Sequence, residues 1–153
     1  MSVRIRPARA AEAAALTDLA LRSKAHWGYD AAFLDACRDE LTVAADEVVR
    51  RRATVADRDG RVLGFTTLEG EPPVGVLGMM FVEPRAIGQG IGRLLFRHTV
   101  TAARELGFAR LTIDADPHAE PFYRAMGAVR TGDVPSGSIA GRLLPRLVLT
   151  VRR

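Results

Sequence analysis

The feature that most constrains this chain is a glycine-rich segment, Gly-Gln-Gly-Ile-Gly at 88–92, which follows an apolar run closed by Pro84. From Ile91 to Leu106, just before Gly107, apolar residues recur with helical spacing, so a strand, a loop and a helix are predicted in succession. Glycine lets the backbone approach a bulky ligand and adopt positive φ. The first N–H groups of a helix lack internal partners and carry partial positive charge, so the segment predicts a seat for a pyrophosphate.

Three ligand classes use a loop of this kind. The dinucleotide fingerprint needs glycine at its sixth position, where this chain has Arg93 counted from Gly88, or Leu95 counted from Gly90. The P-loop needs a Gly-Lys-Ser/Thr ending, and this stretch contains no lysine. Coenzyme A is the third class. An ordinary strand-to-helix turn, with glycines used for packing, stays open as the alternative.

The run at 87–95 resembles the acyl-CoA loop of GNAT (GCN5-related) N-acetyltransferases, whose pattern is Gln/Arg-x-x-Gly-x-Gly/Ala. Arg85, Gly88 and Gly90 fill the pattern in one register, and Ile87, Gly90 and Gly92 in the other. The second register fits the leucines that follow better, but it places Ile87 where the family has a basic or amide side chain. The resemblance implies that backbone N–H groups here bind acetyl-CoA or coenzyme A. The residues expected at this cofactor site are Ile87, Gly88, Gln89, Gly90, Ile91, Gly92 and Arg93.

A second segment, 116–128, resembles the other cofactor motif of the family, Asn-x-x-Ala-x-x-Phe/Leu-Tyr-x-x-x-Gly-Phe. The family's asparagine is Asp116 here, and Phe122 and Tyr123 match in identity and spacing. The resemblance implies that Tyr123 is the catalytic acid that protonates the departing thiolate, and that Asp116 and Phe122 border the cofactor. A phenol stays protonated near neutral pH and can donate in this way. A core tyrosine on an amphipathic helix is the alternative for Tyr123.

The apolar strand expected at 74–82 supplies the remaining cofactor contacts. Val82 matches the family position whose backbone pairs with the pantetheine arm, and Phe81 and Val82 are the expected neighbours of the oxyanion donor. The base that takes the amine proton is not identified, and a chain of waters is one alternative. The side chains considered for this role are Glu69, Glu71, Glu83 and His26.

The order of expected elements, β-α-α-β-β-β-α-β-α-β-β, predicts one mixed α/β domain over residues 1–153. Helices are expected at 8–24 and 30–40, with one or two further turns within 42–51. Asp59-Gly60 signals a tight hairpin, and Asp116-Pro117 predicts the start of a helix that ends near Gly127. The resemblance implies a GNAT fold: a twisted, mostly antiparallel sheet of about six or seven strands with about four helices.

Two loops are expected to border the acceptor. The first, 23–30, contains His26, Trp27, Tyr29 and Asp30. Its aromatic faces suit a cation, which the Asp30 carboxylate neutralises. An aromatic plug that pins two helices together, with Asp30 as a helix N-cap, is an equal alternative. The second loop, 135–142, carries Arg142, which is suited to a carboxylate, although a plain flexible hairpin is the favoured interpretation.

Composition limits the partners and the setting. The chain has 153 residues, a net charge of +4, and 22 basic residues of which Lys24 alone is lysine. The arginines are scattered and not interleaved with aromatic residues, so no nucleic-acid partner is expected. The single cysteine, Cys37, excludes an internal disulfide and multi-cysteine metal patterns, and no metal is expected. No apolar run of membrane-spanning length or signal peptide is evident, so we expect a cytoplasmic protein without a membrane partner.

The resemblance to GNAT proteins implies an N-acetyltransferase, and we expect it to transfer an acetyl group from acetyl-CoA to a primary amine of a small molecule. The expected route is direct attack of the amine within a ternary complex. One alternative is a protein or peptide N-terminal acetyltransferase. Another is a non-catalytic, acyl-CoA-binding regulatory module on the same fold. A homodimer is left open.

Overall fold

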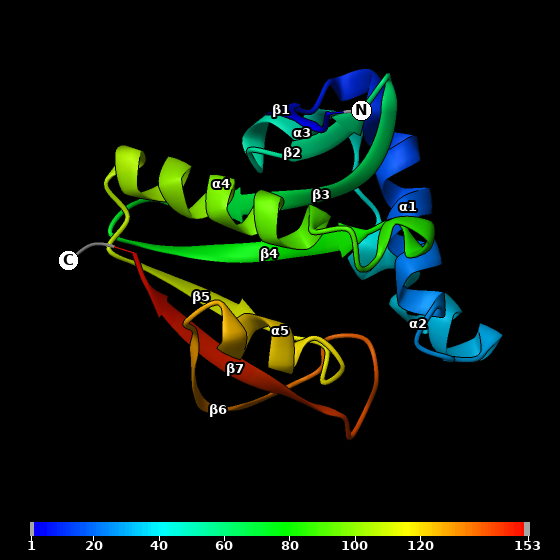
Figure 1. The fold of residues 1–153 in the computed structure, drawn as a ribbon. Helices are drawn as coiled ribbons and strands as arrows, with labels where there is room; N and C mark the ends of the chain where they lie inside the picture. The colour runs from blue at the N-terminus through cyan, green and yellow to red at the C-terminus, as the bar shows by residue number, and fades with distance from the viewer. Residues whose placement is uncertain (1, 152–153) are drawn as a thin grey trace.

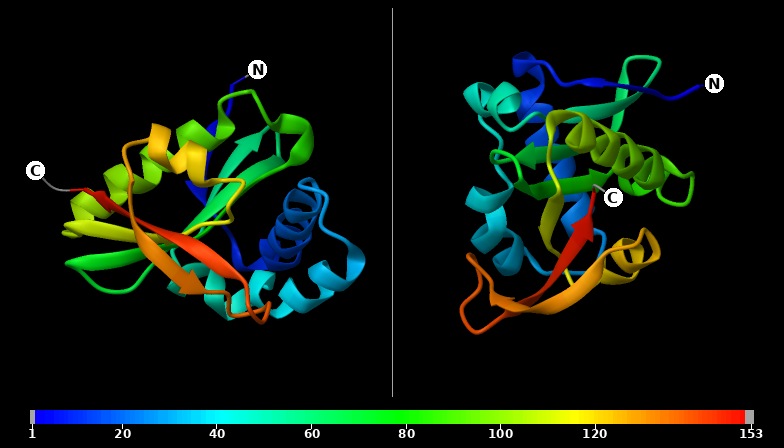
Figure 2. Two further views of the ribbon diagram at one scale, coloured as in Figure 1. Left: turned by 90° about the horizontal axis from the view of Figure 1, so that it is seen from below. Right: turned by 90° about the vertical axis from the view of Figure 1, so that its left-hand side faces the viewer.

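The computed structural model describes residues 2–151 and shows a seven-stranded sheet with helices on both faces (Figure 1). Helices α4 and α5 lie over one face, and α1 and α2 lie over the other (Figure 2). The strands are β1 (Arg4–Pro7), β2 (Thr54–Arg58), β3 (Arg61–Glu69), β4 (Val74–Val82), β5 (Arg110–Asp114), β6 (Val129–Pro135) and β7 (Leu143–Thr150). The α-helices are α1 (Ala13–Ala25), α2 (Ala31–Leu41), α3 (Ala45–Arg50), α4 (Ile91–Leu106) and α5 (Glu120–Ala125), and 3-10 turns span Ala10–Glu12 and Pro84–Ala86.

The strand order is β1-β2-β3-β4-β5-β7-β6, and only β4 and β5 run parallel. Every other neighbouring pair is antiparallel. The predicted mixed α/β arrangement with a mostly antiparallel sheet is therefore confirmed. Five α-helices stand where about four were expected, because residues 45–50 form a helix of their own. Within residues 2–151, no helix is long and apolar enough to cross a membrane.

The parallel strands β4 and β5 pair over a short stretch and then separate. Their register joins Val74–Val76 to Arg110–Thr112. Beyond these pairs, β4 continues beside β3 to Val82, whereas β5 ends at Asp114. Figure 1 shows the two strands diverging in this direction. The edge of β4 that faces away from β3 is consequently unpaired over residues 77–82.

One hydrogen bond shows which backbone N–H and C=O groups of β4 face β3. The Glu83 N–H donates to the Leu63 carbonyl at 2.8 Å. The backbone N–H and C=O groups of successive residues in a strand point to opposite edges. Those of Phe81 therefore also face β3, whereas those of Met80 and Val82 face the gap beside β5. A β-bulge interrupts the register between β3 and β4, where Met80 pairs with Thr66 but Leu77 with Leu68. The bulge gives β4 one extra residue at 78–79 and bends the strand next to the gap.

Two main hydrophobic cores lie on the two sides of the sheet. One packs Leu16 and Leu19 of α1 against Phe65 of β3, and all three are fully buried or nearly so. The other packs α4 against β5 and β7 and contains Phe108 and Leu147, both fully buried. Each such side chain contributes about 1.5–3 kcal/mol on burial, so these cores fix the positions of α1 and α4 on either side of the gap.

The segment 116–119 departs from the expectation. A helix starting at Asp116-Pro117 was predicted, and this is wrong, because α5 begins at Glu120 and residues 116–119 form a turn. Asp116 does not cap a long helix. Its carboxylate accepts hydrogen bonds from Lys24 and Tyr29, which belong to the distant N-terminal part of the chain. These tertiary contacts override the local capping preference.

Candidate functional site

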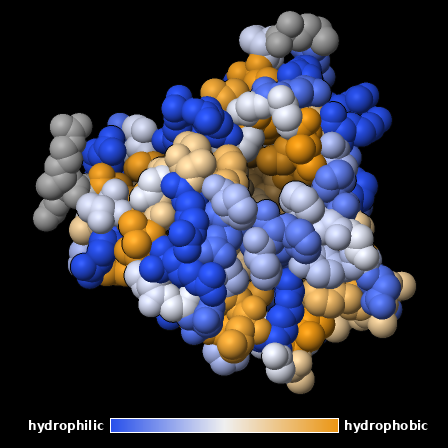
Figure 3. All heavy atoms as spheres, turned by 60° about the horizontal axis from the view of Figure 1, so that its bottom comes forward, coloured by the Kyte–Doolittle hydropathy of each residue, from blue (hydrophilic) through white to orange (hydrophobic). Residues whose placement is uncertain are grey.

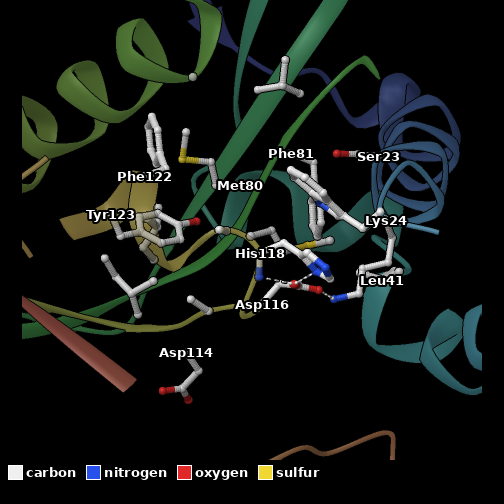
Figure 4. A pocket seen from close by; sticks show the side chains of 18 of the residues that line it. Ser23, Lys24, Leu41, Met80, Phe81, Asp114, Asp116, His118, Phe122 and Tyr123 are labelled. Carbon is white, nitrogen blue, oxygen red and sulfur yellow. Dashed lines mark hydrogen bonds and ion pairs between the residues drawn. The ribbon is translucent and has the colours of Figure 1, made fainter. Parts of the chain in front are cut away.

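A cavity of about 510 Å³ opens where β4 and β5 separate. Its walls come from the unpaired part of β4, the end of β5, the first turn of α4, and α5 (Figure 4). The C-terminal end of α1, the end of α2 and the loop before β7 close the far side. In the space-filling view, hydrophobic side chains gather around a hollow that is bordered by hydrophilic residues (Figure 3). The cavity thus has an apolar floor and a polar rim at one end.

The N-terminus of α4 presents unpaired backbone donors to this cavity. Gly88 and Gly90 have φ of 88° and 82°, a left-handed conformation that glycine adopts without strain. The Leu94 N–H donates to the Gly90 carbonyl at 3.1 Å and begins the helical ladder. The N–H groups of residues 91–93 precede that ladder, and no side chain of the described residues caps the helix. These donors, together with the helix dipole, form a seat for an anion.

Most residues expected at the cofactor site lie in the cavity wall. The wall includes Phe81, Val82, Ile87, Gly88, Gly90, Ile91, Gly92, Arg93, Asp116 and Phe122. Gln89 is the exception: its side chain turns outward, accepts from Arg58 at 3.1 Å and donates to the Arg85 carbonyl at 3.3 Å. Gly92 packs closely on β4, because a Cβ there would lie 3.3 Å from the Met80 methyl carbon. The loop and the free edge of β4 therefore face the same space.

Tyr123, expected to be the catalytic acid, lies in the wall of the cavity. Its ring packs against Phe122 and Phe96, and only 6% of the residue is exposed. The hydroxyl points into the open space (Figure 4) and makes no hydrogen bond to any described residue. Burial, and then the charge of Asp116, raise the pKa of this phenol above its usual value. Tyr123 is therefore held in the form that can donate a proton.

Asp116 is the centre of a polar cluster at the rim. Its carboxylate accepts from the Lys24 ammonium at 2.6 Å, the Tyr29 hydroxyl at 2.9 Å and the His118 N–H at 2.8 Å. Arg142 Nη2 lies 3.5 Å from the same carboxylate. Burial opposes ionisation of Asp116, but hydrogen bonding and charge from Lys24 outweigh it and hold its pKa well below the usual range. Desolvation and the nearby carboxylate raise the pKa of Tyr29 to about 12.

The four residues expected to border the acceptor have different surroundings. Trp27 lines the cavity and stacks on His118 with ring centroids 5.0 Å apart. Tyr29 stacks on Phe33 and binds Asp116 from behind the wall. Asp30 accepts from the Phe33 N–H at 2.9 Å, so it is the N-cap of α2, as one alternative predicted. His26 contacts Trp27 edge-on and is not among the lining residues.

Sequence reasoning did not place Cys37 or Glu40 at this site and included Lys24 only as a member of the loop 23–30, yet all three line the cavity. The signals available for Lys24 were its place in that loop and its being the chain's sole lysine. Arg142, noted only as suited to a carboxylate, also lines the cavity. These residues converge from segments about a hundred positions apart, which no local pattern encodes.

The acidic residues considered as the base are occupied elsewhere. Glu83 is paired with Arg22 at 2.7 Å, and Glu69 is paired with Arg51 at 2.9 Å. Glu71 is exposed and lies 3.7 Å from Arg52. None of the three lines the cavity. Within the described part of the chain, no group of three or more His, Cys, Asp or Glu residues is arranged to hold a metal ion.

The sequence matches the family model described as an acetyltransferase (GNAT) domain over residues 17–137. A curated relative, the peptidyl-lysine N-acetyltransferase YjaB of Salmonella typhimurium, is 36% identical over 78 residues, which cover 51% of this chain. The match covers 49% of that relative, so the chain matches about half of the relative's length.

Solved structures extend the likeness to the whole fold. A GCN5-related N-acetyltransferase from Rhodopseudomonas palustris superposes with a TM-score of 0.82 at 22% identity, covering 98% of this chain and 96% of the other. The PaiA N-acetyltransferase from Thermoplasma acidophilum, solved in complex with coenzyme A, gives 0.79 at 17% identity, covering 98% and 99%. The seven-stranded sheet with its split between β4 and β5 is thus the fold of these proteins, and the chain belongs to the GNAT acetyltransferase family.

Proposed function

We propose that this protein is an acetyl-CoA-dependent N-acetyltransferase that acts on a primary amine of a small molecule. One observation carries the proposal. The unpaired N–H groups at the start of α4, the unpaired edge of β4 and the hydroxyl of Tyr123 all meet in one cavity. Family membership and the coenzyme A bound to the structural neighbour PaiA support the identity of the donor.

The residues present fit coenzyme A. The donors of residues 91–93 are placed for the diphosphate, and the backbone of Val82 is free to pair with the amide groups of the pantetheine arm. Met80, whose N–H also faces the gap, is the candidate oxyanion donor next to the bulge. When bound, acetyl-CoA supplies the acetyl group as a thioester with a thiolate leaving group.

Proton transfer at the leaving group is assigned to Tyr123. In the overall reaction a C–N bond forms and the C–S bond breaks, the amine loses a proton, and the sulfur gains one. The Tyr123 hydroxyl is protonated, has no competing partner among the described residues and points into the cavity. The phenol therefore delivers a proton to the departing sulfur, and solvent restores the one it loses. The amine proton leaves through water, because Glu69 and Glu83 are ion-paired away from the cavity.

A protein acceptor is the second candidate, and the name of the curated relative favours it. A lysine side chain of a peptide would have to pass Trp27, Lys24 and Arg142, which line the acceptor end of the cavity. The charged side chains of this lining favour a small molecule that carries its own polar groups over a long aliphatic arm. Small amines and lysine peptides assayed side by side separate the two.

The test has a binding arm and a turnover arm. Calorimetry with coenzyme A and acetyl-CoA should show saturable binding at one site, and thiol release from acetyl-CoA should depend on an added amine. Absence of binding to both compounds would overturn the proposal. Binding without acetyl transfer to any small amine, peptide N-terminus or lysine peptide would instead favour the regulatory module.

A further inference from the structure

We propose that the acceptor carries a carboxylate as well as its amine, and that Arg142 binds this carboxylate. The inference rests on the proposed acetyl transfer and names the substrate class of the same site. It starts from Arg142, at the end of the loop that joins β6 to β7, whose guanidinium lies in the cavity wall with 17% of the side chain exposed.

Packing and one hydrogen bond fix the position of the Arg142 side chain. Its guanidinium carbon lies 4.8 Å from the Phe33 ring centroid and 5.1 Å from that of Tyr29. Nη2 donates to the Tyr29 hydroxyl at 2.7 Å. A guanidinium stacked between neighbours loses little further entropy on binding a ligand. Arg142 is therefore preorganised before an acceptor enters.

The donors of Arg142 that remain are free to bind a ligand. Nε and Nη1 make no hydrogen bond to a described residue, and neither is enclosed by protein. Nη2 carries two N–H groups and shares one edge of the guanidinium with Nε and the other edge with Nη1. Its hydrogen bond to the Tyr29 hydroxyl uses one of these N–H groups, so one edge keeps a pair of unused donors. Guanidinium groups bind carboxylates through paired N–H donors. A cavity-facing arginine with unused donors is the residue type that such a ligand needs.

The carboxylates near Arg142 leave its remaining donors without a partner. Two cations, Lys24 and Arg142, flank the single carboxylate of Asp116. Asp114 is taken by Arg146 at 2.7 Å, and Glu40 at the rim accepts from Ser138 at 2.8 Å. No ion pair joins Glu40 to either cation among the residues described. Glu40 balances the second cation in the overall charge, but it forms no ion pair with Arg142. The unused donors of Arg142 therefore lack a carboxylate partner among the described residues, and an acceptor carboxylate would supply one.

The experiment compares matched acceptors on the same enzyme. Leucine, phenylalanine, glutamate, methionine, 4-aminobutyrate and 6-aminohexanoate are each assayed against their own carboxamides, with kcat and KM determined separately. The proposal expects kcat/KM to be about 10- to 100-fold higher for carboxylates of the preferred spacing, the size of one charge-assisted contact. Equal or better use of the carboxamides would overturn it.

Two variants connect that preference to Arg142. In Arg142→Gln the preference for carboxylate over carboxamide should fall to about twofold or less, mainly through KM, because the charge and the fork are both removed. Arg142→Lys should restore only part of it. Tyr29→Phe is the matched control, because it removes the hydrogen bond to Arg142 but keeps the guanidinium, so it should retain most of the preference. If Tyr29→Phe abolished it as fully as Arg142→Gln, disruption of the cluster would be the cause instead.

A binding arm keeps this inference separate from the proposed function. Calorimetry titrates the carboxylate and carboxamide probes into the protein saturated with coenzyme A. Weaker binding of carboxylates by Arg142→Gln supports the inference even where turnover is slow. If coenzyme A binds and acetyl transfer proceeds but Arg142→Gln alters no carboxylate preference, the inference fails while the proposed function stands. If coenzyme A does not bind to the wild type, the proposed function itself fails.

Discussion

At the residue scale, Tyr123 has the role that is easiest to test. Tyr123→Phe keeps the ring that packs against Phe96 and Phe122 but removes the proton donor. We expect kcat to fall by about 10²-fold, the usual effect of losing a general acid, while the affinity for coenzyme A changes less than twofold. Steady-state kinetics and calorimetry measure the two quantities. An unchanged kcat would show that another group protonates the leaving thiolate.

The pH dependence gives an independent check on the same hydroxyl. Burial and Asp116 raise the pKa of Tyr123, so its proton is retained at pH values where an exposed tyrosine begins to lose it. The wild-type rate should therefore show no decline from loss of this donor up to about pH 10. A rate profile measured from pH 6 to 10 with a saturating amine tests this. A fall in kcat with an apparent pKa near 9 that disappears in Tyr123→Phe would contradict it.

Single residues also show where sequence reasoning ends. Gly88, Gly90 and Tyr123 could be assigned because each belongs to a short motif with fixed spacing. The Lys24–Asp116 contact joins residues 92 positions apart, and the Arg142–Tyr29 contact spans 113. No local pattern encodes such pairs, so the polar rim of the cavity becomes visible only in the fold.

At the scale of elements, the start of α4 depends on two left-handed glycines. Gly90→Ala would force a side chain into a conformation that costs about 1–2 kcal/mol, and its Cβ would project into open space where the ligand is expected. We expect affinity for coenzyme A to fall about tenfold. Gly60→Ala is the matched control, because Gly60 has φ of 84° and equally open surroundings but lies in the β2–β3 hairpin.

Both variants should therefore lose similar stability in urea unfolding, and only Gly90→Ala should lose ligand affinity, measured by calorimetry. Equal affinity in the two variants would show that the loop backbone does not bind the cofactor. Greater loss of affinity in Gly60→Ala would point to a general effect of destabilisation.

The attachment of β1 to the 3-10 turn at Ala10–Glu12 depends on an ion pair. Arg6 donates to both oxygens of Glu12, at 3.0 and 2.8 Å, and to Asp57 at 3.0 Å. The hydrogen bonds from Arg6 lower the pKa of Glu12 to about 2. A carboxylate with a lowered pKa stabilises the fold fully above its unfolded pKa of about 4.5, and this contribution is lost as the pH falls toward 2.

Glu12→Gln should therefore lower the free energy of unfolding by about 1–3 kcal/mol at pH 7 and by clearly less at pH 3. Urea unfolding of both proteins at the two pH values measures the difference. The same change at exposed Glu105 should cost less than about 0.5 kcal/mol at either pH. A loss for Glu12→Gln that does not vary with pH would contradict the ion-pair explanation.

Some elements could be predicted more closely than others. The expected strand at 74–82 coincides with β4, because a proline borders each end of an apolar run of strand length. The helix expected from Asp116 begins four residues later, because its capping residue is recruited by Lys24 and Tyr29. Local sequence signals therefore predict the bounds of elements whose ends make only local contacts. Where an end residue makes tertiary contacts, these contacts determine where the element begins.

At the scale of the whole molecule, ligand binding should stabilise the protein. Coenzyme A bound in the gap would contact β4 and α4, and it would raise the free energy of unfolding by about 2.7 kcal/mol at 100 times its Kd. For a chain of this size, that corresponds to a rise in Tm of roughly 5–10 °C. Thermal unfolding with and without the ligand measures it.

The same titration has informative variants. Tyr123→Phe should keep the rise in Tm, since it does not bind the diphosphate, and Gly90→Ala should show a smaller rise at equal ligand concentration. No rise in the wild type would contradict binding in the gap. The assignment of residues 1–153 to one domain stays a prediction.

The brief pairing of β4 with β5 makes the site mechanically sensitive. Three residue pairs, from Val74–Arg110 to Val76–Thr112, act as a pivot, and β4 continues six residues past it to Val82. This stretch is about 20 Å long and stays paired with β3, so turning the β3–β4 pair by about 5° displaces the end of β4 by about 1.7 Å. Misplacement by such an amount is enough to slow a reaction severely. Substitutions at these three residue pairs can therefore lower the reaction rate without changing any residue that lines the cavity.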